Sequence, residues 1–132
     1  MLKNVKGSCL CGNIQFEIDS IKPEFGTCHC DHCRKLNAGS TFFLPQISVK
    51  KISSDDWEKV AHYVSSDWGR RGFCPKCGTY LYHGRRDKVS VAFSVELFEQ
   101  IVEQGVFTSQ IWCSSKPDYY TYSNNTSMSD FE

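Results

Sequence analysis

Cysteine is the residue type that gives this 132-residue chain most of its chemical potential. Seven of its eight cysteines fall into three short groups, Cys9 and Cys11, then Cys28, Cys30 and Cys33, and then Cys74 and Cys77. Spacings of one or two residues let several thiolates converge on one metal ion. An even number also fits disulfides, but the chain starts without the apolar stretch of a secretory signal, and disulfides are rare in reducing compartments. We therefore expect zinc–thiolate sites in a cytoplasmic protein rather than four disulfides.

The pair Cys74 and Cys77 has the form of a zinc knuckle, because Pro75 presets the turn between them and Gly78 tolerates the left-handed conformation that closes such a turn. A thioredoxin-type redox pair would open a helix, whereas residues 79–82 are rich in β-forming types. A knuckle supplies two of the four ligands of a closed, structural zinc site. Cys9 and Cys11 can supply the other two.

The group Cys28, Cys30 and Cys33 is different, because three thiolates within six residues can hold one ion and leave a fourth position for water or substrate. Two alternatives stay open on spacing alone. His29 or His32 could be a fourth ligand and close the site, or the cluster could be a thiol redox sensor.

Three further candidates lie outside these groups. His62 and His83 are in aromatic, strand-like stretches, and we expect them to be ordinary packed or surface residues. Cys113 has no partner at ligand spacing, so we expect it to fill space in the core or in a strand.

The elements that must position these residues are mostly strands. Alternation of polar and apolar residues, or short β-forming runs, predicts strands over 13–19, 40–44, 47–49, 62–64, 79–83, 89–93 and 106–112. Short helices are expected over 31–36 and 96–104, the second closed by Gly105. The class is mainly β with short helical insertions, in a single domain over 1–122 followed by a polar, frayed tail over 123–132.

Composition excludes several classes of protein. Hydrophobic residues make up 40% of the chain, enough for a packed core, and no apolar run is long enough to span a membrane. Fifteen basic and fifteen acidic side chains cancel. Basic pairs such as Arg70-Arg71 and Arg85-Arg86 are too few for the roughly 6–10 phosphate contacts of a nucleic-acid binder, so nucleic acid is not an expected partner.

The order of these motifs resembles the glutathione-dependent formaldehyde-activating enzyme family. The matching segments are Gly7-x-Cys9-x-Cys11-Gly12, Cys28-His29-Cys30-x-x-Cys33-Arg34-Lys35, Arg71-x-Phe73-Cys74-x-x-Cys77-Gly78-Thr79-x-Leu81 and the late segment Ile111 to Pro117. The resemblance implies a β-tent of packed antiparallel sheets with two zinc ions. Cys9, Cys11, Cys74 and Cys77 would form the closed structural site, and Cys28, Cys30 and Cys33 the open catalytic one.

The same resemblance implies a carbon–sulfur lyase that joins glutathione and formaldehyde to S-hydroxymethylglutathione. Arg71, Arg34 and Lys35 are then candidates for binding the carboxylates of glutathione or a similar thiol. The chain departs from the family pattern at Gln110, where members often have histidine, at 95–97, and after Pro117. The alternative is a non-catalytic zinc-binding module, either a redox sensor or a chromatin-type module, since the domain also resembles that of centromere protein V.

Overall fold

Short strands are the main elements of the computed structural model, which describes residues 1–131. The strands are β1 (Leu2–Ser8), β2 (Gln15–Ile21), β3 (Glu24–Cys28), β4 (Thr41–Phe43), β5 (Ile47–Ser48), β6 (Ile52–Ser53), β7 (Ala61–Val64), β8 (Gly69–Phe73), β9 (Tyr80–Arg85), β10 (Ser90–Phe93), β11 (Val106–Ile111) and β12 (Ser127–Met128). The α-helices are α1 (Asp31–Asn37) and α2 (Glu99–Gln104), and single 3-10 turns cover Val49–Lys51, Trp57–Lys59, Val95–Leu97 and Cys113–Ser115. Among these residues no helix is long and apolar enough to cross a membrane.

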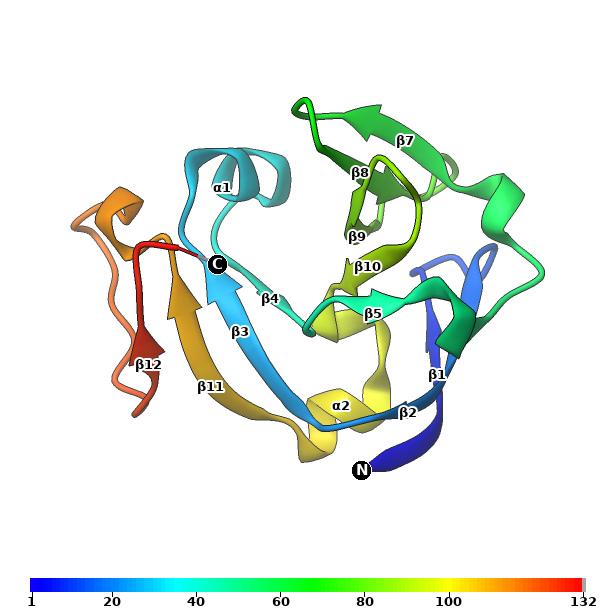
Figure 1. Ribbon diagram of the computed structural model, residues 1–132, viewed down its shortest axis with the longest axis horizontal. Coiled ribbons are helices and arrows are strands. Elements are labelled where there is room, and N and C mark those ends of the chain that lie inside the picture. Colours follow the sequence, from blue (N-terminus) through cyan, green and yellow to red (C-terminus); the bar gives the residue numbers. More distant parts are fainter. Residues whose placement is uncertain (132) are drawn as a thin grey trace.

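The strands form three sheets, with the orders β1-β2-β6, β5-β10-β9-β8-β7 and β12-β11-β3-β4. The first two are antiparallel, as expected. The third is mixed, because β11 returns after α2 and pairs in parallel with both β3 and β12. In Figure 1, α1, β7 and β8 lie in the upper part of the molecule, β11 and β12 form its left flank, and β1 and β2 lie at the right.

Aromatic side chains fill the core between the first two sheets. Phe16 of β2 packs on Phe93 of β10 with ring centroids 4.8 Å apart, and Phe93 packs on Phe98 at 5.2 Å. The backbone of β1 approaches this cluster so closely that a Cβ on Gly7 would lie 2.4 Å from the Phe98 ring. Glycine at position 7 is therefore a packing requirement of the core.

Most predicted elements are present, and the deviations have local causes. The predicted helix over 96–104 begins only at Glu99, because Phe98 has an extended backbone and buries its ring in the core. The predicted strand over 106–112 ends at Ile111, because Trp112 is left-handed at φ 55°. β1, β3 and β8 were missed, since each contains polar or glycine residues where an apolar alternation would be expected. The two-residue strands β6 and β12 were missed as well.

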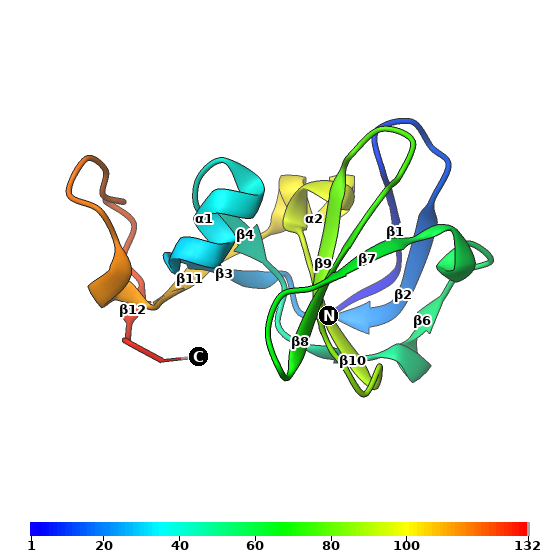
Figure 2. The ribbon, with the colours of Figure 1, turned by 90° about the horizontal axis from the view of Figure 1, so that it is seen from above.

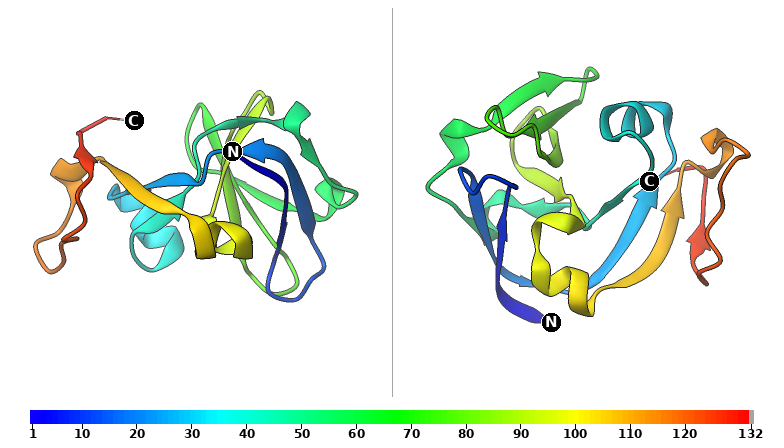
Figure 3. Two further views of the ribbon diagram at one scale, coloured as in Figure 1. Left: turned by 90° about the horizontal axis from the view of Figure 1, so that it is seen from below. Right: turned by 180° about the vertical axis from the view of Figure 1, so that it is seen from behind.

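The segment expected to be a frayed tail is partly paired. β12 runs beside β11, and the backbone N–H groups of Cys113 and Ser129 bond to Ser129 and Gln110 carbonyls at 3.0 Å. Figure 3 shows this segment at the outer edge of the third sheet, and Figure 2 shows it on the side of the molecule away from the β1–β2 hairpin. These backbone bonds explain the order that a polar composition did not predict. Glu132, also part of the expected tail, is outside the described residues.

Candidate metal centres

Cys9, Cys11, Cys74 and Cys77 converge on one point, with all four sulfurs within 4.8 Å of one another. The Cys9 and Cys11 sulfurs are 3.6 Å apart, and those of Cys11 and Cys74 are 3.8 Å apart. Four sulfurs at about 2.3 Å from a tetrahedral zinc ion would be separated by about 3.8 Å. The cluster therefore fits a closed tetrahedral metal site that links the turn after β1 to the turn between β8 and β9.

Backbone conformation and N–H groups hold both turns in place. Gly12 and Gly78, which follow the two cysteine pairs, are left-handed at φ 81° and 78°, as predicted for Gly78. Thr79 connects the turns, because its hydroxyl lies 3.0 Å from the Cys77 sulfur and accepts from the Leu10 N–H at 3.1 Å. Hydrogen bonds from Thr79 lower the pKa of Cys77 to about 5, which favours the thiolate that a metal ion needs.

Cys28, Cys30 and Cys33 form the second cluster, with their sulfurs also within 4.8 Å of one another. Cys28 ends β3, Cys30 is the N-cap of α1, and Cys33 lies in the first turn of that helix. The Cys30 sulfur accepts from the Cys33 N–H at 3.3 Å. The same side chain therefore caps α1 and is a candidate metal ligand.

The three thiols affect one another's ionisation. Hydrogen bonding with Cys28, followed by that with Cys33, lowers the pKa of Cys30, whereas hydrogen bonding with Cys30 and then Cys33 raises the pKa of Cys28. A divalent cation bound among them would stabilise all three as thiolates. Arg71 also faces the cluster, donating from Nη1 to the Cys33 sulfur at 3.3 Å. This positive charge would offset the excess negative charge of three thiolates around a divalent ion.

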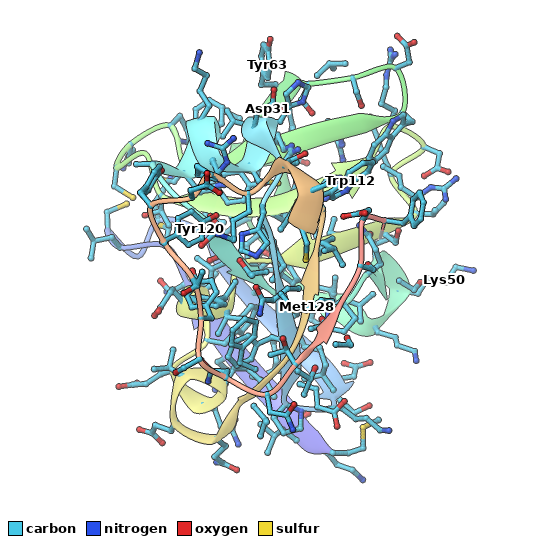
Figure 4. The ribbon with its side chains drawn as sticks, turned by 90° about the vertical axis from the view of Figure 1, so that its left-hand side faces the viewer. Asp31, Lys50, Tyr63, Trp112, Tyr120 and Met128 are labelled. Carbon is cyan, nitrogen blue, oxygen red and sulfur yellow. The ribbon has the colours of Figure 1, made fainter. Side chains whose placement is uncertain are left out.

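A cavity of about 300 Å³ opens onto the second cluster. Besides the three cysteines, its walls are Asp31, His32, Ser66, Trp68, Arg71, His83, Trp112 and Ser115. The two tryptophans come from different parts of the fold, Trp68 from the turn before β8 and Trp112 from the residue after β11. Figure 4 shows Asp31 and Trp112 in the upper part of the face that carries the C-terminal segment. The second cluster is thus reached from outside through this cavity.

His29 lies between Cys28 and Cys30 in the sequence, but its ring is hydrogen-bonded to residues outside the second cluster. Its ring is buried, with Nδ1 2.7 Å from the Tyr120 hydroxyl and Nε2 2.8 Å from the Gln110 side-chain oxygen. The Gln110 amide in turn donates to the Thr126 hydroxyl at 2.9 Å. With both ring nitrogens hydrogen-bonded, His29 does not complete the second cluster. Its role is to connect the Cys28–Cys30 loop to the C-terminal segment.

The candidate carboxylate-binding residues are distributed over two adjoining cavities. Arg71 is only 6% exposed and lines the cavity of the second cluster. Arg34 and Lys35 line a neighbouring cavity of about 540 Å³ on the other side of Asp31 and His32. Arg34 already donates to the His29 and Ser115 carbonyls at 3.0 and 3.5 Å, which leaves Lys35 as the exposed cation there.

Two of the residues set apart as ordinary, His62 and Cys113, belong to neither sulfur cluster and do not line the cavity of the second one. Cys113 begins a 3-10 turn and is partly exposed, so the prediction that it fills the core or a strand is wrong. His62 bonds through Nε2 to the Tyr82 hydroxyl at 2.5 Å, and the Cys113 sulfur donates to the Gln110 carbonyl at 3.5 Å. His83 is different, because it lines the cavity of the second cluster. Sequence reasoning missed His83 and Trp68, and the signal that could have found His83 is the β8–β9 pairing, which places it opposite Arg71.

Known proteins resemble the chain in both sequence and fold. The model of the glutathione-dependent formaldehyde-activating enzyme family matches residues 4–118. A Schizosaccharomyces pombe protein named as an uncharacterized lyase is 32% identical over 123 residues, covering 93% of this chain and 88% of its own. The crystal structure of a Rhodobacter sphaeroides protein shares the fold, with a TM-score of 0.61 and 21% identity over 77% of this chain and 96% of that one. The chain belongs to the glutathione-dependent formaldehyde-activating enzyme family.

Proposed function

We propose that this protein is a zinc-dependent carbon–sulfur lyase that makes and breaks the adduct between a small thiol, such as glutathione, and an aldehyde, such as formaldehyde. The observation that supports this most is the second cluster itself. Three cysteine sulfurs converge at a cavity, and within residues 1–131 no histidine, aspartate, glutamate or further cysteine joins them as a fourth ligand. Three protein ligands with one open position are typical of catalytic zinc sites, whereas four cysteines are typical of structural ones.

The net reaction is an addition. The S–H bond of the thiol breaks, a C–S bond forms to the carbonyl carbon, and the carbonyl oxygen gains a proton to become a hydroxyl. A zinc ion bound by the three cysteines would favour the thiolate form of the thiol and polarise the aldehyde. The walls of the cavity hold both partners close together, and such positioning is the larger part of catalysis for an addition that is already easy in water.

Arg71 acts beside the cysteine cluster, where the sulfur end of the thiol substrate binds. Its Nη1 and Nε donate to Cys33, Tyr80 and Ser65 at 3.3, 3.1 and 3.2 Å. These bonds hold the guanidinium beside the sulfur cluster, where its charge favours an incoming thiolate. The more distant carboxylates of glutathione would extend past His32 into the adjoining cavity, toward Lys35.

The test is magnetisation exchange by NMR between free formaldehyde hydrate and its glutathione adduct. We expect the wild-type protein to accelerate exchange above the uncatalysed rate. Cys30→Ser should abolish the acceleration and reduce bound zinc from about two ions to about one per chain, while serine still caps α1. Cys113→Ser is the matched control and should retain both the accelerated exchange and the two zinc ions. Equal exchange rates with wild type, Cys30→Ser and no protein would contradict this activity.

A further inference from the structure

His83 is a cavity residue for which the cysteine chemistry provides no role. It lies on β9 directly opposite Arg71 of β8. Residues paired across neighbouring strands lie on the same face of a sheet, so both side chains face the second cluster. Both line its cavity, together with Cys28, Cys30 and Cys33. The next residues along each strand, Gly72 and Gly84, belong to the opposite face.

The imidazole of His83 is held in place without being hydrogen-bonded. Trp68 packs edge-on against the ring, with centroids 5.6 Å apart and planes at 61°. The backbone of Gly69 lies so near that a Cβ there would be 3.7 Å from His83 Nε2. Within the described part of the chain, neither ring nitrogen has a hydrogen-bond partner. Neither nitrogen is among the fully buried side-chain atoms that lack a partner, so both are open to the cavity and available to a ligand there.

The ring is also neutral near pH 7. Burial, and next the positive charge of Arg71, lower the pKa of His83 to about 4, and the opposing effect of Cys30 is smaller. A neutral imidazole offers one N–H donor and one acceptor nitrogen. It can therefore pair with a hydroxyl or carbonyl oxygen and has no net charge with which to attract an anion.

We propose that His83 recognises the oxygen of the thiol–aldehyde adduct, and so makes the cavity selective for thiols that carry an oxygen close to sulfur. This inference rests on the proposed function, because it takes the cavity to be a thiol site. In the forward reaction the imidazole N–H donates to the carbonyl oxygen as the C–S bond forms. The thiol proton ends on that oxygen, so the histidine is unchanged at the end of the turnover.

The test compares two probes of nearly equal size, 2-mercaptoethanol and ethanethiol, by calorimetric titration of the zinc-loaded protein. Only the first carries a hydroxyl near sulfur. One neutral hydrogen bond predicts that wild type binds 2-mercaptoethanol about fivefold to tenfold more tightly. His83→Phe keeps the packing on Trp68 but should lose the preference, His83→Gln should retain part of it, and His62→Phe, on the other side of β8, should retain all of it.

The outcomes separate this inference from the proposed function. Equal affinity of wild type for both probes overturns the role of His83 and leaves the thiol site standing. Failure of both probes to bind protein carrying two zinc ions overturns both. Should His83→Phe fail to fold, imidazole NMR of wild type decides, because the His83 ring signals must shift with 2-mercaptoethanol and not with ethanethiol. Unshifted signals with bound 2-mercaptoethanol would also overturn the inference.

Discussion

At the scale of single residues, the two cysteine clusters differ in what surrounds the sulfurs. The first is surrounded by turn backbone, glycines and Thr79, which fix four sulfurs in a closed arrangement. The second is surrounded by side chains with chemical functions of their own, including Arg71, His83 and two tryptophans. The two clusters therefore differ in the neighbours of their cysteines as well as in the number of their sulfurs.

His83 makes stability depend on pH in a direction that follows from its lowered pKa. Its pKa in the folded protein is about 4, against an ordinary value of about 6.5, so between these values the unfolded chain binds more protons. Stability therefore falls as the pH falls through this window. From pH 7 to pH 5 we expect wild type to lose about 2 kcal/mol more unfolding free energy than His83→Gln.

Chemical denaturation of the two proteins at both pH values measures this difference. Because metal release affects wild type and His83→Gln alike, it cancels in the comparison. Parallel losses of stability in the two proteins would show that the imidazole is not shielded from water as the structure describes.

At the scale of elements, strands could be predicted from the sequence where polar and apolar side chains alternate. They could not be predicted where the backbone of a glycine packs against a neighbouring side chain. β2 and β9 have apolar side chains at regular positions, and both were predicted. β8 was missed because it is Gly69, two arginines, Gly72 and Phe73. A Cβ on Gly72 would lie 2.6 Å from the Tyr82 ring, so the ring packs directly on the backbone of this glycine. Single-sequence patterns carry no signal for such close approaches.

The metal ligands could be predicted because ligand spacing is local, whereas the cavity around them could not. Cys28, Cys30 and Cys33 are within six residues, so their convergence needs only one turn of helix. The walls of the cavity come from β8, β9, α1 and the segment after β11, and they meet only through sheet pairing. The role of His29 was left open for the same reason, since Gln110 and Tyr120 are more than 80 residues away in the chain.

Gln110 connects β11, the Cys28–Cys30 loop and the C-terminal segment through its side-chain amide. Gln110→Ala would leave the buried His29 Nε2 without its partner and remove the bond to Thr126. An unsatisfied buried donor costs about 1–3 kcal/mol, and we expect a loss of unfolding free energy in this range. Gln104→Ala, at an exposed position of α2, is the matched control and should change stability by less than about 0.5 kcal/mol.

Denaturant titration of both variants gives the comparison. If Gln110→Ala were as stable as Gln104→Ala, the amide would not be holding the loop and the C-terminal segment together.

At the scale of the whole molecule, the two clusters belong to different parts of the fold. The first joins the β1–β2 hairpin to the five-stranded sheet, which are the two sheets around the aromatic core. The second lies where the mixed sheet and α1 meet the face of the five-stranded sheet formed by β8 and β9. The first cluster thus connects two sheets beside the core, whereas the second lies at a boundary between sheets and opens onto a cavity.

The most direct test of the central claim, that the second cluster is an open metal site for a thiol, is a glutathione titration of the cobalt-substituted protein followed by its absorption spectrum. Cobalt(II) takes tetrahedral sulfur sites and is coloured, so a new sulfur ligand changes the spectrum. We predict that the thiolate charge-transfer absorption rises and saturates at one glutathione per chain in wild type. In Cys30→Ser, where only the closed cluster holds cobalt, it should not change. An unchanged spectrum in wild-type protein that carries two cobalt ions would contradict the account.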